Sequence, residues 1–104
     1  RKVVSSFSYS DEQIGKTIAE VSKDFNYVCD PHGAIGFAAL RDHLAAGEHG
    51  LFLETAHPAK FIDTVEKFAE RKVEIPARLA KFLNGTKRSV LIDKDYHNIL
   101  PSLK

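Results

Sequence analysis

The 104-residue sequence has a single cysteine, Cys29, and no methionine or tryptophan. One cysteine cannot form an internal disulfide or share a metal with a second thiol, so the composition fits a reducing compartment. No apolar run approaches the roughly 20 residues that span a bilayer, and the first residues lack the apolar core of a signal peptide. We therefore expect a cytoplasmic protein with no membrane partner.

The chain also lacks an excess of charge of either sign. Its 15 Lys and Arg residues face 14 Asp and Glu residues, and the net charge is +1. No strong field therefore attracts nucleic acid or an anionic membrane, and neither is an expected partner. With 43% apolar residues, the composition predicts one globular unit over residues 1–104. The absence of methionine at position 1 favours truncation of a longer protein.

Capping residues and apolar periodicity predict four helices. Ser10 and Gln13 have the spacing of a capping box before an amphipathic pattern. Asp30 can cap a helix that has Pro31 in its first turn. The first two expected helices cover residues 11–24 and 34–46, and two more begin at Pro58 and Pro76. The last of them should end near Gly85 and turn Leu79, Phe82 and Leu83 inward.

Short apolar runs between these helices predict strands at 26–29, 51–53 and 89–92. Strands that alternate with helices favour right-handed crossovers and a parallel sheet, which makes the expected fold class α/β. Two or three short strands leave sheet edges open. The pattern therefore predicts a part of a larger sheet.

Two stretches, 27–33 and 51–58, share one pattern. Each passes from an apolar run into a polar cluster with His and Pro, and then into a helix. In a parallel sheet both clusters would lie at the carboxyl edge, where open α/β sheets bind ligands. That edge is the candidate site.

The same stretches resemble a known family. Residues 30–36, Asp-Pro-His-Gly-Ala-Ile-Gly, resemble the Asp-Pro-His-Thr-Ala-Val-Gly stretch of threonine synthases. Residues 55–61 match the Thr-Ala-His-Pro-Ala-Lys-Phe stretch of these enzymes without a substitution. The resemblance extends from about Ser8 and is closest to the C-terminal end of the longer microbial and fungal type.

This resemblance implies a pyridoxal-phosphate enzyme of fold type II. Such an enzyme, a carbon-oxygen lyase acting on phosphates, converts O-phosphohomoserine and water into threonine and phosphate. The lysine that binds the cofactor covalently and the glycine-rich phosphate loop of the family are not in this sequence. The resemblance thus implies that this chain is a C-terminal portion of the large domain and contains no catalytic residue of its own. Such a portion would be inactive alone and would need the remainder of the enzyme chain.

The resemblance also assigns candidate site residues. Thr55 matches the threonine whose hydroxyl contacts the pyridine nitrogen of the cofactor. Asp30 and His32 match the first motif and His57 the second, and we expect all three near the active site without an assigned role. Gly33 departs from the family's usual threonine.

Structural interpretations remain open for each of these residues. Thr55 could use its hydroxyl to satisfy an amide at a helix start, and His57 could orient the chain that enters its helix. Asp30 is expected to cap a helix in any case, and Cys29 to be a core residue rather than a reactive thiol. The five histidines lack metal-ligand spacing, so no metal is expected. The alternative function is a non-catalytic α/β interaction domain, which would bind a partner through open sheet edges and the helix at 34–46.

Overall fold

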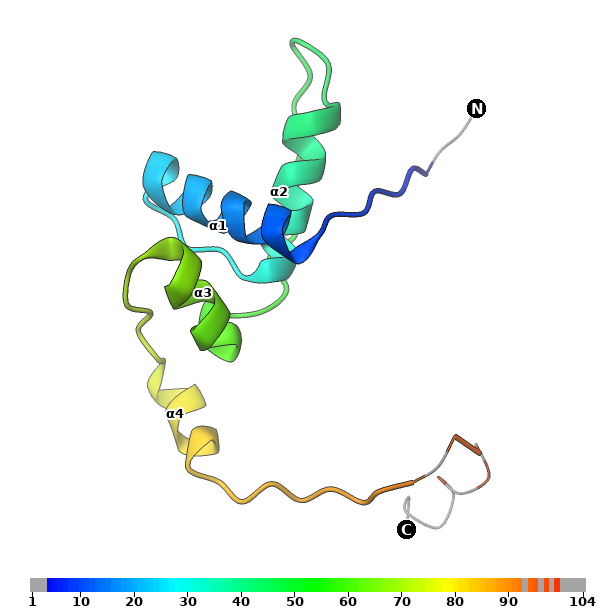
Figure 1. Ribbon diagram of the computed structural model, residues 1–104, viewed down its shortest axis with the longest axis vertical. Helices are drawn as coiled ribbons and strands as arrows, with labels where there is room; N and C mark the ends of the chain where they lie inside the picture. Colours follow the sequence, from blue (N-terminus) through cyan, green and yellow to red (C-terminus); the bar gives the residue numbers. More distant parts are fainter. Residues whose placement is uncertain (1–3, 93, 96, 98, 100–104) are drawn as a thin grey trace.

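The computed structural model describes residues 4–92, 94, 95, 97 and 99. Within this part of the chain the helices follow one another in the order shown in Figure 1. They are α1 (Asp11–Phe25), α2 (Pro31–His43), the short 3-10 helix η1 (Pro58–Phe61), α3 (Ile62–Ala69) and α4 (Ala77–Leu83). None of the described helices combines the length and apolarity needed to cross a bilayer.

The first helix begins at the expected capping box. The main-chain N–H of Gln13 donates to Ser10 Oγ at 3.3 Å, and the N–H of Ser10 donates to Gln13 Oε1 at 2.8 Å. Asn26 ends the helix in the left-handed conformation, with φ of 51°. The prediction of a helix at 11–24 is therefore confirmed to within one residue.

The second helix begins at Pro31 behind the Asp30 cap, as predicted, but ends at His43 rather than at 46. A separate turn follows, in which the N–H of Ala45 donates to a Glu48 carboxylate oxygen at 2.9 Å. Gly47 in this turn has φ of 84°, a conformation that side chains disfavour. The carboxylate and the glycine together stabilise a turn in place of one more helical turn.

The core lies where α1 packs against both α2 and α3. Ile18 of α1, Ala34 of α2 and Val65 of α3 are fully buried at this contact. The Ser22 hydroxyl donates to the carbonyl of Ala69 at 3.3 Å and joins α1 to the end of α3. These three helices form the packed part of the structure.

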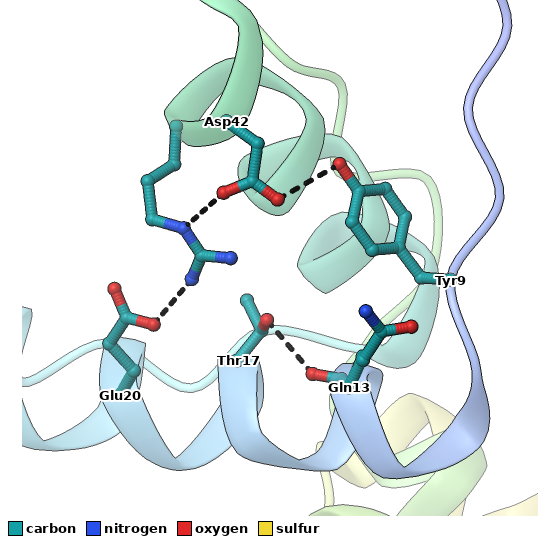
Figure 2. A network of polar contacts seen from close by, with 6 residues as sticks. Tyr9, Gln13, Thr17, Glu20 and Asp42 are labelled. Carbon is teal, nitrogen blue, oxygen red and sulfur yellow. Dashed lines mark hydrogen bonds and ion pairs between the residues drawn. The ribbon is translucent and has the colours of Figure 1, made fainter.

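A polar network joins α1 to the end of α2 (Figure 2). The Arg41 guanidinium contacts Glu20 on α1 and Asp42 on its own helix, and the Tyr9 hydroxyl donates to Asp42 at 3.3 Å. The hydrogen bond from Arg41 lowers the pKa of the Asp42 carboxyl. The network thus links α1 and the residues before it to the C-terminal end of α2.

The expected parallel strands at 26–29, 51–53 and 89–92 are absent from the described part of the chain, which is helical. A strand exists only when its main chain pairs with a neighbour, and apolar residues alone do not supply that neighbour. The prediction of an α/β unit with its own short strands is corrected accordingly.

The predicted inward face of α4 is also wrong. No residue of α4 is buried, and Phe82 and Leu83 are 68% and 57% exposed. Figure 1 shows α4 apart from α1 and α2, followed by a chain that runs away from the helices. The apolar residues of α4 thus have the spacing of a packed helix without an element that covers them.

Candidate functional site

The chain turns after α2 and runs back beside it (Figure 1). Three alternate residues of this returning segment, residues 50–57, lie against the helix. The facing pairs are Gly50 with Leu40, Phe52 with Gly36, and Glu54 with Gly33. The returning segment thereby brings the second polar cluster to the first turn of α2.

A hydrogen bond joins the two polar clusters. The main-chain N–H of Asp30 donates to Glu54 Oε1 at 2.8 Å. Asp30 is fully buried, and its Oδ1 accepts the N–H of Gly33 at 2.8 Å while its Oδ2 lies 2.8 Å from His32 Nδ1. The two clusters are therefore adjacent, as the sequence predicts, and Asp30 is the cap that it was expected to be.

His32 extends from this cap toward solvent. Its side chain is 60% exposed, and its ring packs edge-on against Phe61 of η1 with the ring centroids 5.3 Å apart. This contact joins the start of α2 to the helix that follows the second cluster. The structure thus brings Asp30 and His32 to one junction with residues 54–61.

His57 begins η1 as a cap. Its Nδ1 accepts the N–H of Ala59 at 3.1 Å, which requires that this nitrogen carries no proton. The structural interpretation of His57, that it orients the chain entering its helix, is therefore confirmed.

Thr55 lies on the other side of the returning segment. Exposure alternates along residues 51–57, so Thr55 is exposed together with Leu51 and Leu53, while Phe52 and Glu54 are half-buried against α2. The cap of η1, which a threonine could have supplied, comes from His57 instead. The Thr55 side chain thus lies beside the junction and faces away from α2.

Glu54 is a further residue of this junction, beyond those expected from the sequence. Burial raises the pKa of its carboxyl, an effect that the charge of Asp30 increases and the hydrogen bond from the Asp30 N–H opposes. Its Oε2 atom is buried and has no hydrogen-bond partner. Its alternation with Phe52 could have indicated which side of the segment Glu54 occupies, but not its partners.

Burial also decides the chemistry of Cys29. The residue is fully buried, and burial together with the charge of Glu54 raises the pKa of its thiol to about 11. A thiol that stays protonated is a poor nucleophile and a poor metal ligand. Cys29 is therefore a core residue, as the sequence predicts. No cluster of three or more His, Cys, Asp or Glu residues with the geometry to bind a metal occurs in the described part of the chain.

A hollow of about 500 Å³ lies next to the junction, and Glu54 is one of the residues that line it. It lies between residues 54–58 of the returning segment and two other stretches, 26–28 and 71–74. Thr55 does not line it. A group that contacts the Thr55 hydroxyl would therefore approach from the exposed side of the segment and not through this hollow.

Residues 33–100 match the family model of the C-terminal region of threonine synthase. Threonine synthase from Buchnera aphidicola of Acyrthosiphon pisum is 49% identical over 72 residues, which are 69% of this chain and 17% of the relative. Threonine synthase from Escherichia coli K12 is 45% identical over 71 residues, 68% of this chain and 16% of that protein.

A crystal structure of threonine synthase from Escherichia coli superimposes with a TM-score of 0.78 at 36% sequence identity. The match covers 88% of this chain and 21% of that structure. The chain spans about a sixth of the length of the curated relatives described above. The family model, the sequence relatives and the solved structure all agree, and the chain belongs to the threonine synthase family, to whose C-terminal region it corresponds.

Proposed function

We propose that this chain is the C-terminal part of a pyridoxal-phosphate-dependent threonine synthase, and that Thr55 contacts the pyridine nitrogen of the cofactor. The whole enzyme would convert O-phosphohomoserine and water into threonine and phosphate. Family membership supports the activity. Because the chain is about a sixth of its relatives, the lysine that binds the cofactor and the phosphate-binding loop would come from the remainder of the enzyme.

The position of Thr55 is the observation that carries the proposal. The residue is exposed on a segment whose alternate residues are anchored against α2, and the nearby cap is already supplied by His57. An exposed hydroxyl on a segment whose neighbouring residues contact α2 can donate a hydrogen bond to a planar aromatic nitrogen.

The chemistry of the hydroxyl also fits the cofactor. Pyridoxal phosphate, when bound, serves as an electron sink for carbanions formed on the substrate. The neutral hydroxyl of Thr55 can donate a hydrogen bond to the ring nitrogen but cannot hold a proton there as a carboxylate does. Thr55 would thus orient the ring and moderate its electron withdrawal.

Asp30 and His32 would lie beside the same cofactor. Asp30 holds His32 through the 2.8 Å contact between Oδ2 and Nδ1, and the His32 ring remains open to solvent on its other side. Together they would supply a fixed polar edge to the site. His57 would contribute by starting η1.

Thr55→Val in the full-length enzyme tests the proposal. Valine keeps the shape of threonine and removes the hydrogen bond, so we expect turnover to fall by about tenfold or more while the thermal unfolding temperature hardly changes. Turnover, the absorbance spectrum of the bound cofactor and the unfolding temperature are the measurements. Thr55→Ser is the matched control, because it keeps the hydroxyl and should keep most of the turnover. A Val variant with wild-type turnover and spectrum would exclude Thr55 from the site.

A non-catalytic docking module is the second candidate, because Leu51 and Leu53 are 82% and 73% exposed. Such residues could bind a separate partner as well as the remainder of an enzyme. The gene upstream of Arg1 separates the two functions. A continuous reading frame with a cofactor lysine and a glycine-rich loop supports the enzyme, whereas a start codon directly before Arg1 supports the docking module.

A further inference from the structure

The carboxylate of Glu54 occupies the space beside Gly33 that a side chain would need. A Cβ atom built on Gly33 would overlap Glu54 Oε2. The two residues are therefore a matched pair, because the carboxylate can adopt this position only while residue 33 has no side chain. Gly33 is also the position at which the first motif departs from the threonine of the stretch that it resembles.

The same carboxylate holds the two polar clusters together. Glu54 Oε1 accepts the main-chain N–H of Asp30 at 2.8 Å, directly before the first turn of α2. Thr55 is the next residue along the chain, so this bond links the main chain beside Thr55 to Asp30. The other oxygen, Oε2, is buried without a partner, which costs free energy in the folded state.

We infer that Glu54 is a positioning residue that holds Thr55, and that Gly33 is required because it leaves room for the Glu54 carboxylate. The inference deepens the proposed function and rests on the cofactor contact of Thr55. Glu54 lies on the α2 side of the segment and Thr55 on the exposed side, so Glu54 acts through the main chain and does not touch the cofactor.

Glu54→Ala and Glu54→Gln in the full-length enzyme give the first test. We expect Glu54→Ala to lower kcat by about tenfold with little change in KM, and to shift the absorbance maximum of the bound cofactor. Glutamine keeps an oxygen acceptor for the Asp30 N–H and should recover most of kcat. Glu48→Ala is the matched control, since Glu48 also accepts a main-chain N–H, that of Ala45 at 2.9 Å, away from the junction. The control should behave as the wild type.

Hydrogen exchange of the apoenzyme gives a readout that does not depend on activity. Without the Glu54 carboxylate, the amides of residues 54–57 should exchange faster than in the wild type, because the segment loses its bond to Asp30. Glu48→Ala should leave exchange at these amides unchanged.

Gly33→Ala tests the pairing. The added Cβ displaces the carboxylate, which lies at the end of a flexible side chain, so the fold should be retained while kcat falls as in Glu54→Ala. In the Glu54→Ala background the same substitution has no carboxylate to displace and should have no further effect. Additive losses of kcat in the double variant would overturn the inference.

Three further outcomes would overturn it. Wild-type kcat, spectrum and exchange in Glu54→Ala, beside an impaired Thr55→Val, would reject the positioning role and leave the proposed function intact. A Glu54→Ala variant that only unfolds at lower temperature, with unchanged kcat per bound cofactor, would show a structural role alone. If Thr55→Val were itself silent, the proposed function would fail and the inference with it.

Discussion

Asp30 caps α2 and also bonds to the returning segment. A fully buried carboxylate is costly unless donors surround it, and here the Gly33 N–H and the His32 ring are both within 2.8 Å. Its own N–H donates to Glu54, so its main chain and its side chain both form hydrogen bonds. Asp30 thus caps α2 and, through Glu54, joins its first turn to the candidate site.

Replacing Asp30 with alanine should therefore loosen α2 from its first turn. The lost cap is worth about 1–2 kcal/mol, so we expect the amides of α2 to exchange about tenfold faster in the full-length protein. Hydrogen-exchange mass spectrometry of residues 30–43 measures this, and Asp30→Asn, which can still cap, is the control. Ser10→Ala removes the exposed cap of α1 and should affect that helix alone. Equal exchange in Asp30→Ala and the wild type would mean that the cap does not hold α2.

The caps could be predicted from sequence because the side chain of a cap and the main-chain N–H that donates to it lie within three residues of each other. The serine and aspartate that begin α1 and α2 are examples, as are the histidine and proline that begin η1. The role of Glu54 could not, since its partners Asp30 and Gly33 are more than 20 residues away and meet it only after the chain reverses. The contact of Thr55 with the cofactor remains a prediction that rests on the sequence motif. The exposed position of the residue is compatible with that contact.

At the scale of elements, helices were predictable and strands were not. A helix closes its hydrogen bonds within its own residues, so apolar periodicity and caps suffice to indicate α1, α2 and α3. A strand needs main-chain partners from elsewhere, and the stretches expected as strands have none in the described part of the chain. The prediction of an inward face on α4 was wrong for the same reason. The spacing of residues indicates an apolar face but not which element covers it.

Substitution of Ile18 tests whether the core lies where α1 packs against α2 and α3. It is fully buried where α1 meets its two neighbours, so Ile18→Ala should lower the free energy of unfolding by about 2–5 kcal/mol. Ile14, on the same face but only partly buried, should cost less when replaced by alanine. Limited proteolysis of the full-length protein within α1 and α3 measures the difference. Equal protection in both variants would contradict the assignment of the core to this contact.

At the scale of the whole molecule, the chain is more extended than a compact domain. Its radius of gyration is 18.0 Å, against about 13 Å for a compact domain of this length. Large apolar residues remain exposed beyond the helical core, among them Leu51, Leu53 and Leu91. Exposed apolar residues on this scale indicate surfaces that another part of a protein covers. The proposed remainder of the synthase is the partner that fits, because the relatives are about six times longer.

The exposed side of the returning segment should behave differently in the 104-residue chain and in the full-length enzyme. Residues 51–55 have the alternating exposure of a strand but pair with no neighbouring strand within the described residues, so their amides should exchange rapidly in the 104-residue chain. In the full-length enzyme the same amides should exchange at least tenfold more slowly, because the remainder of the sheet would pair with them. The amides of α1, which are bonded within their own helix, are the internal control. If residues 51–55 exchange equally fast in both proteins, the segment is not a strand of the larger sheet, and the exposed side of Thr55 faces solvent in the enzyme too.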